Sequence, residues 1–189
     1  MQFEVEQKHF VPDVRKLHER LAERGVEIGP PIQQADRYFA HPCRDFSQTD
    51  EALRIRTVGD KSFVTYKGPK LDAASKTRRE LELPLDAGDA DGSKFADLLH
   101  LLGFRPVAVV HKRRRAFTVD ASGRHVEGAL DEVDGVGTYV ELELKAEESG
   151  LDEARRAIAT LATELDLGFS ERRSYLEIML ENIAKLVAN

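Results

Sequence analysis

The feature that most constrains the fold of this chain is a series of short segments in which charged and apolar residues alternate. The first is FEVEQKHF, at residues 3–10. Successive side chains of an extended strand point to opposite faces, so Glu4, Glu6 and Lys8 share one face and Val5 lies on the other. A single strand of this kind is ordinary, because a half-buried antiparallel strand turns a polar face to water.

Later segments repeat the alternation and sort their charges by sign. The like-charged pairs are Arg54 with Arg56, Lys112 with Arg114, Glu80 with Glu82, and Glu141 with Glu143. Any one of these pairs is interpreted most simply as a solvated strand face. Like charges that neighbour each other on a sheet repel, however, and an open face normally intersperses the two signs. The segregation therefore favours strands whose charged faces look at one another inside an enclosed channel.

The wider pattern predicts an α+β fold with eight strands and about four helices. The strands are expected at 3–10, 36–40, 52–58, 62–68, 77–85, 107–119, 124–133 and 138–146, and the helices at about 14–25, 93–102, 152–166 and 171–187. Short connections such as Gly59-Asp60 favour antiparallel pairing. Eight strands suffice to close a barrel with a narrow interior. We expect one domain over residues 1–189, with the C-terminal helices packed outside the barrel.

Composition narrows the possible classes of function. The 189 residues carry a formal net charge of −6, which disfavours a general nucleic-acid binder. The basic run HKRRR at 111–115 would divide between the two faces of a strand. A lone cysteine, Cys43, excludes an intramolecular disulfide and fits a reducing compartment. No apolar run approaches the roughly 18 residues of a spanning helix, so we expect a cytoplasmic protein with no nucleic-acid or membrane partner.

The charged faces point to a chemistry that needs both signs. They comprise seven cationic and seven anionic positions: Lys8, Arg54, Arg56, Lys67, Arg78, Lys112 and Arg114, against Glu4, Glu6, Glu80, Glu82, Asp131, Glu141 and Glu143. Carboxylate clusters suit a hard divalent cation such as Mg²⁺ or Mn²⁺, which takes oxygen ligands. Clusters of Arg and Lys suit phosphate oxygens. A metal-bridged polyphosphate would satisfy both sets at once.

These motifs resemble those of a known family. EVEQK, at 4–8, matches the ExExK signature of the CYTH superfamily, the triphosphate tunnel metalloenzymes, which include class IV adenylyl cyclases, thiamine triphosphatases and inorganic triphosphatases. The resemblance continues in order through LRIR (53–56), YKGP (66–69), KTRRELE (76–82), HKRR (111–114), LDEVDGVG (130–137) and ELE (141–143). It ends near RSYLEIML, at 173–180, which is similar to a closing helix in the cyclase branch. The ordered set is far more specific than ExExK alone.

The resemblance implies an eight-stranded antiparallel tunnel that holds a triphosphate together with Mg²⁺ or Mn²⁺. By that analogy the main metal ligands would be Glu4, Glu6, Glu141 and Glu143, with Glu80 and Asp131 helping or orienting them. The phosphates would be lined by Lys8, Arg54, Arg56, Lys67, Arg78, Lys112 and Arg114. The residues expected to carry the catalytic step are Glu4, Glu6, Lys8 and Glu143.

Three functions remain open at this point. The first is a class IV adenylyl-cyclase-like enzyme that converts ATP to cyclic AMP and pyrophosphate. The second is a triphosphatase acting on inorganic, thiamine or nucleoside triphosphate, and the third is a non-catalytic triphosphate sensor. The assembly is expected to be a monomer or a homodimer. Tyr175 is interpreted as a core residue, and the loop at 68–76 as a connection in preference to a lid over the tunnel mouth.

Overall fold

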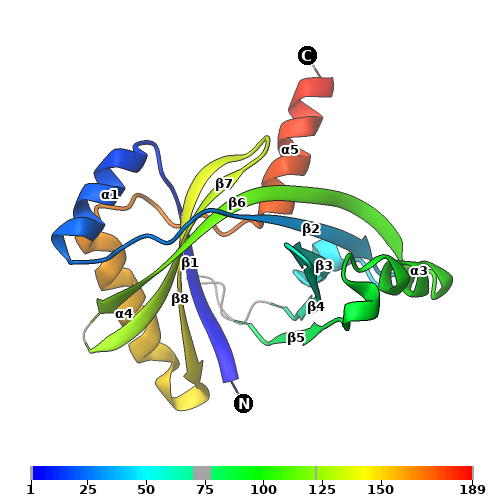
Figure 1. Ribbon diagram of the computed structural model, residues 1–189, viewed down its shortest axis with the longest axis horizontal. Coiled ribbons are helices and arrows are strands. Elements are labelled where there is room, and N and C mark those ends of the chain that lie inside the picture. Colours follow the sequence, from blue (N-terminus) through cyan, green and yellow to red (C-terminus); the bar gives the residue numbers. More distant parts are fainter. Residues whose placement is uncertain (1, 70–77, 122, 189) are drawn as a thin grey trace.

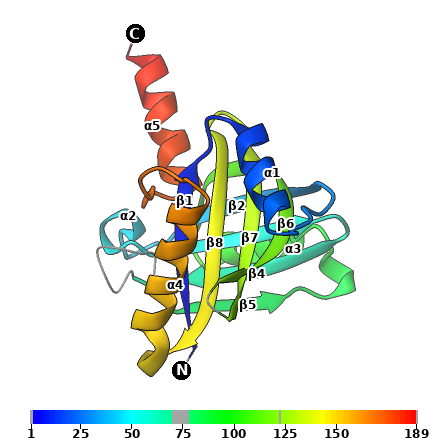
Figure 2. The same ribbon diagram turned by 90° about the vertical axis from the view of Figure 1, so that its left-hand side faces the viewer.

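The computed structural model describes residues 2–69, 78–121 and 123–188, and its strands form one curled antiparallel sheet (Figures 1 and 2). Along the sheet the order is β1-β8-β7-β6-β2-β3-β4-β5. The strands are β1 (Gln2–Phe10), β2 (Ile32–Ala40), β3 (Ala52–Val58), β4 (Lys61–Lys67), β5 (Glu80–Pro84), β6 (Arg105–Ala121), β7 (Arg124–Val133) and β8 (Gly137–Glu147). The predicted eight-stranded antiparallel architecture is confirmed in the described part of the chain.

In the part of the chain that the structure describes, the two edges of the sheet approach each other through an isolated bridge. Glu4 on β1 pairs with Arg78, which precedes β5. The two backbone amide nitrogens lie 3.5 and 3.4 Å from the opposite carbonyl oxygens. This bridge joins the first strand to the segment before β5. The two edges of the curled sheet thereby meet, and the sheet surrounds a tunnel. The predicted strand at 77–85 begins one residue outside the described part, and most of the loop predicted at 68–76 also lies outside it.

The described helices lie around the outside of the curled sheet, on both of its halves. They are α1 (Val14–Glu23), α2 (Phe46–Thr49), α3 (Ser93–Leu101), α4 (Leu151–Glu164) and α5 (Tyr175–Val187), with short 3₁₀ turns η1 (Ala87–Asp89) and η2 (Glu148–Gly150). Figure 2 shows α4 lying against β1 and β8, with α1 on the same side of the sheet. Asp13 caps α1, because its carboxylate accepts hydrogen bonds from the Arg15 and Lys16 amides. The short helix α2 was not predicted from the sequence, because its four residues are too few for a helical hydrophobic period.

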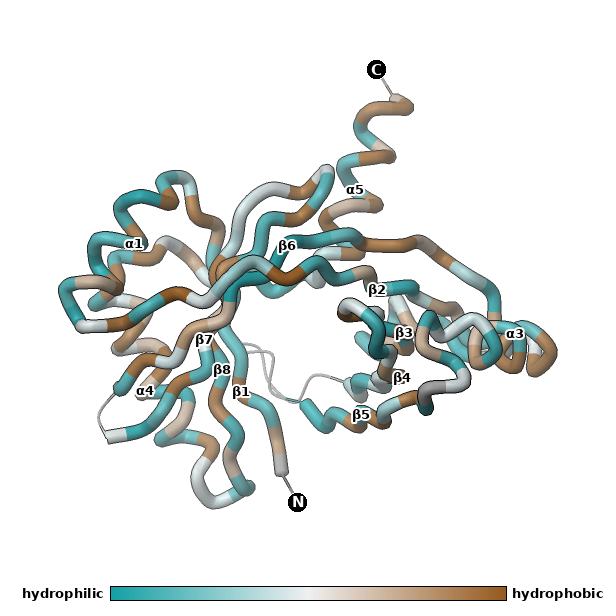
Figure 3. The backbone as a smooth tube through the Cα atoms, viewed as in Figure 1, coloured by the Kyte–Doolittle hydropathy of each residue, from teal (hydrophilic) through white to brown (hydrophobic). Residues whose placement is uncertain are grey.

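The main core lies between the sheet and the helices α1 and α4, which explains where the charged faces must go. Val5, Val140 and Leu142 are fully buried against Ile158 and Leu161 of α4. Alternation then forces the intervening charged residues of β1 and β8 onto the opposite, concave face. Figure 3 shows this mixture of hydrophilic and hydrophobic residues along the strands. Burial of one face therefore fixes the charged lining of the other.

The last helix, α5, lies outside the barrel as expected, but it begins later than the predicted start at about residue 171. Ser174 begins it with a reciprocal capping box to Glu177, so residues 171–173 are not helical. Tyr175 and Ile178 are buried in a second core with Tyr38 and Val110. Beyond this first turn the helix projects away from the sheet (Figure 1). None of the described helices is long and apolar enough to cross a membrane.

Gly128 provides a direct test of how tightly this sheet is packed. It pairs with Phe117 across β6 and β7, and a Cβ atom at Gly128 would lie 2.1 Å from Cε2 of the buried Phe117 ring. We expect Gly128→Ala to lower the free energy of unfolding by about 1–3 kcal/mol, because a packed core accommodates an added methyl only through strain. Denaturant unfolding measures the change. Gly168→Ala is the matched control, because no atom lies within 4 Å of its added Cβ, and equal effects in both variants would contradict the packing argument.

Candidate active site

The concave face of the sheet encloses a cavity of about 790 Å³. Its lining contains nearly every charged residue singled out from the sequence: Glu4, Glu6, Lys8, Arg54, Arg56, Lys67, Arg78, Glu80, Glu82, Lys112, Arg114, Glu141 and Glu143. The exception is Asp131, which is completely buried and lies outside the lining. Strand alternation therefore located the cavity correctly, whereas the roles of its residues stay predictions.

Strand register explains how residues distant in the sequence meet in this cavity. Glu6 lies opposite Glu143 and Lys8 lies opposite Glu141 across β1 and β8. Lys67 lies opposite Glu80 across β4 and β5, with their side chains in an ion pair. Directly opposed residues share one face of an antiparallel sheet. Each strand thus delivers its charged pair to the same interior.

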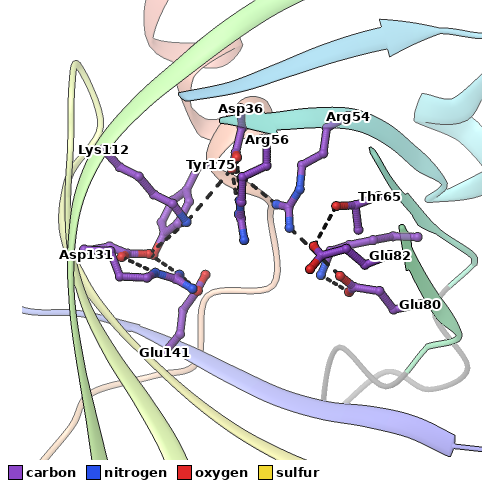
Figure 4. Close-up of polar contacts among 12 residues, drawn as sticks. Asp36, Arg54, Arg56, Thr65, Glu80, Glu82, Lys112, Asp131, Glu141 and Tyr175 are labelled. Carbon is purple, nitrogen blue, oxygen red and sulfur yellow. Dashed lines mark hydrogen bonds and ion pairs between the residues drawn. The ribbon is translucent and has the colours of Figure 1, made fainter. Parts of the chain in front are cut away.

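A buried carboxylate that the sequence analysis missed organises the cations near β3. Oδ1 and Oδ2 of Asp36, on β2, accept a forked pair of hydrogen bonds from Nε and Nη2 of Arg56 at 2.7 and 2.8 Å. Nη1 of Arg54 donates to Oδ2 of Asp36 at 3.3 Å. Burial would raise the pKa of Asp36, but the guanidinium groups of Arg54 and Arg56 hold it well below its usual range. Figure 4 shows this cluster at the centre of the site.

Asp131 forms a second cluster behind the lining. It accepts a forked pair of hydrogen bonds from Arg114, and Lys112 donates to it at 3.3 Å. The Tyr175 hydroxyl donates to its Oδ2 at 3.0 Å. Arg114 also pairs with Glu141, which lines the cavity. Asp131 had been expected to help hold metal; in the structure its two oxygens accept hydrogen bonds from two cations and a phenol.

Lys112 has an unusual environment among the lining cations. Its ammonium nitrogen lies 3.3 Å from Asp131 and 4.0 Å from Asp36, so it stands between the two buried carboxylates. Burial, and then the charges of Arg114 and Arg56, lower the pKa of Lys112 to about 7. The negative charges of Asp131 and Glu141 oppose this lowering of the pKa.

The remaining carboxylates lie close together on β1, β5 and β8. We call this group, Glu4, Glu6, Glu80 and Glu143, the carboxylate wall. Burial and a hydrogen bond with Glu80 raise the pKa of Glu4. Burial and the charge of Glu6 raise the pKa of Glu143. Lys67 pairs with Glu80 and lies 3.7 Å from Glu4, and its charge keeps the pKa of Glu80 low in spite of burial. This wall holds more negative charge than its local cations neutralise, which raises the proton affinity of Glu4 and Glu143.

The carboxylate wall has the donor chemistry of a divalent-cation site, although its side chains are not arranged as a finished one. Within residues 2–69, 78–121 and 123–188, no three acidic, histidine or cysteine side chains already stand as a metal-binding group. Glu4, Glu6 and Glu143 nevertheless offer hard oxygen donors in one cavity. A bound divalent cation would take the place of the protons that the raised pKa values favour. The residues present fit Mg²⁺ or Mn²⁺ on these grounds.

Tyr175 is buried, as predicted, but it also belongs to the site. Its ring centroid lies 4.1 Å from the Lys8 ammonium and 5.3 Å from that of Lys112. Lys8 is itself fully buried and donates to the Arg173 carbonyl oxygen. Strand alternation gave no signal for Tyr175, because the residue begins a helix and reaches the cavity from outside the sheet. The first turn of α5 therefore completes the cationic end of the lining.

Fold and lining together define a class of protein: an antiparallel tunnel whose interior gathers acidic and basic side chains from separate strands. The chain belongs to the CYTH domain family, whose model matches residues 2–175. The resemblance inferred from the motifs is thereby confirmed. Like the motif resemblance, this match spans almost the whole chain.

Several relatives are similar over nearly their full length. A Methanocaldococcus jannaschii protein named "Putative adenylate cyclase" is 36% identical over 93% of this chain and 97% of its own. Adenylate cyclase CyaB of Aeromonas hydrophila is 31% identical over 92% of this chain and 86% of its own. The structure of the PH1819 protein from Pyrococcus horikoshii is 41% identical, with a TM-score of 0.82, over 94% of this chain and 98% of that chain.

A more distant structure shares the fold alone. It is a Hippeastrum protein described as a "putative adenylyl cyclase" with a dominant triphosphatase activity. It is 17% identical, with a TM-score of 0.64, and the match covers 96% of both chains. The same tunnel fold is therefore associated with more than one named activity.

Proposed function

We propose that this protein is a divalent-metal-dependent enzyme that acts on a triphosphate inside the tunnel. The observation that carries the proposal is the convergence of seven cationic side chains and a crowded carboxylate wall on one cavity of about 790 Å³. A volume of this size lies in the range of small-molecule sites and accommodates a nucleotide. Membership of the CYTH family and the names of two relatives support an enzymatic role.

The lining suggests a division of labour between its two sides. Arg54, Arg56 and Arg114 would bind the phosphate oxygens, since guanidinium groups make forked contacts with them. Lys8, Lys67, Arg78 and Lys112 would add point charges and further donors along the chain of phosphates. A bound Mg²⁺ or Mn²⁺, held by Glu4, Glu6 and Glu143 with Glu80 and Glu141 nearby, would neutralise phosphate charge and acidify the attacking oxygen.

Charge stabilisation is the main task of such a site. Phosphoryl chemistry develops negative charge on equatorial and leaving oxygens, and fixed cations placed there lower the barrier. Asp36 and Asp131 would hold those cations in place from behind. Lys8 contacts the Arg173 carbonyl and the Tyr175 ring, so α5 would fix the direction of its ammonium.

An adenylyl-cyclase-like reaction is the first choice between the possible activities. In that reaction the 3′-hydroxyl of ATP attacks the α-phosphorus, and pyrophosphate leaves. The two relatives named as adenylate cyclases cover nearly the whole chain at 36% and 31% identity, which favours this assignment. A triphosphatase is the second candidate, since water could attack in the same lining and the Hippeastrum protein with this fold is described with that activity.

A product assay distinguishes these activities. We expect purified protein with Mg²⁺ or Mn²⁺ and ATP to release cyclic AMP and pyrophosphate in equal amounts, and a chelator to abolish the reaction. Inorganic triphosphate and thiamine triphosphate are tested in parallel, with products separated by chromatography. Orthophosphate without cyclic AMP would select the triphosphatase. Triphosphate binding without any product would contradict an enzymatic role and select the sensor.

A further inference from the structure

Asp36 differs from the other carboxylates of the site in position and in partners. It lies at the middle of β2, opposite Arg56 on β3 and Val110 on β6. Its residue is 1% exposed, and it is not among the residues that line the cavity. A group in this place cannot touch a substrate in the tunnel, so any effect on the reaction must pass through its neighbours.

The side chains that pair with the Asp36 carboxylate are Arg54, Arg56 and Lys112, and all three line the cavity. The fork from Arg56 occupies both Asp36 oxygens at 2.7 and 2.8 Å, and Nη1 of Arg54 shares Oδ2 at 3.3 Å. The ammonium of Lys112 lies 4.0 Å from the same Oδ2. One carboxylate therefore gathers cations from two strands that are not adjacent, since β2 separates β3 from β6 (Figure 4).

The fork also fixes which edge of Arg56 is offered to the cavity. A guanidinium has five N–H donors in a planar arrangement. Asp36 takes the Nε and Nη2 edge, so the donors on Nη1 remain for an incoming anion. Without the carboxylate, three like charges would repel one another and their long side chains would regain rotamer freedom.

We propose that Asp36 is a positioning residue that holds Arg54, Arg56 and Lys112 in the arrangement that stabilises the reacting triphosphate. The inference rests on the proposed function and assigns a role to a residue that the charge pattern of the sequence did not reveal. Because Asp36 is ringed by cations, it is not a metal ligand. Loss of the Asp36 charge removes negative charge from behind the lining. The lining cations would then still attract a triphosphate but would no longer align it.

Asp36→Asn tests this role because it keeps the side-chain shape and removes the charge. We expect kcat to fall by about 100-fold, the cost of a small misplacement of catalytic groups, while KM changes much less. Asp166→Asn is the matched control, since Asp166 also pairs with two cations, Lys16 and Arg20, but on the exposed surface. That variant should keep wild-type kcat and KM.

A second readout follows the arginines without any turnover. Nitrogen-15 NMR of the Arg side chains should show protected Nε–H signals for Arg54 and Arg56 in the wild type, because both residues are held in a buried cluster. In Asp36→Asn both signals should broaden, or be lost through faster exchange of the Nε–H protons with water. In Asp166→Asn both signals should be unchanged. Thermal unfolding of each variant establishes that it is folded.

The outcomes separate this inference from the proposed function. Wild-type kcat and intact Arg signals in a folded Asp36→Asn protein would overturn the positioning role. Absence of turnover in the wild type with every triphosphate would sink the proposed function, and the NMR comparison would still decide whether Asp36 orders the cations. If Asp36→Asn does not fold, Asp36→Glu takes its place: it keeps the charge but displaces the carboxylate, so unchanged kcat would refute the role.

Discussion

Glu6→Gln is expected to reduce metal-dependent turnover by about 1,000-fold, since removing one carboxylate ligand forfeits several kcal/mol of charge stabilisation in the transition state. Glu6 is largely buried and lies directly opposite Glu143 in the carboxylate wall. The substitution removes repulsion between these opposed charges. We therefore expect the free energy of unfolding to stay within about 1 kcal/mol of wild type. Turnover assays with Mg²⁺ and Mn²⁺, together with denaturant unfolding, measure the two effects separately.

Glu153→Gln is the matched control for this experiment. Glu153 lies on the exposed surface of α4 and pairs with Arg124, outside the cavity. The Glu153→Gln protein should therefore show the wild-type rate of metal-dependent turnover. A Glu6→Gln protein that is folded and equally active at saturating metal would refute the metal-binding role of the β1 carboxylates.

Arg54→Ala is expected to weaken the binding of inorganic triphosphate by roughly 100-fold, because charge-assisted hydrogen bonds contribute about 1.5–3 kcal/mol each. Arg54 lines the cavity and is 8% exposed, with Asp36 at 3.3 Å and Glu80 at 4.0 Å. Its removal also leaves both carboxylates with less compensation, so thermal stability should fall. Calorimetric titration without divalent metal measures the dissociation constant in the absence of turnover.

Arg113→Ala separates the loss of a lining cation from the loss of any arginine. Arg113 stands between Lys112 and Arg114 on β6, but it is exposed on the other face and pairs with Glu132. Its removal should leave the dissociation constant unchanged. If Arg54→Ala and Arg113→Ala both bound triphosphate as tightly as the wild type, the phosphate-binding role proposed for Arg54 would be wrong.

The parts of the site that could be predicted from the sequence are those governed by strand alternation. Arg54 with Arg56, and Glu141 with Glu143, occur as like-charged pairs, and two residues of separation place each pair on one face. The cavity lining follows once the apolar face of each strand is buried. Short hairpin connections, such as the one after Val58, made the antiparallel sheet predictable in the same way.

What could not be predicted depends on contacts between elements. Asp36 is a single inward charge on β2, between Gln34 and Tyr38, so it forms no like-charged pair. Its importance comes from neighbours on β3 and β6 that only the register reveals. Tyr175 reaches the cavity from a helix, where a period of two carries no information. For Asp131 the face was predicted correctly, but its depth was not, because depth depends on how Arg114 and Lys112 fold over it.

The isolated bridge between Glu4 and Arg78 connects the two edges of the curled sheet at one point. The same two residues present an acid and a base to the interior and hold the margins of the sheet together through their main chains. A ligand that binds both side chains would contact both edges of the sheet, β1 and the segment before β5. Occupancy and closure are then thermodynamically linked, so a bound molecule stabilises the closed circumference by the free energy with which it prefers that form.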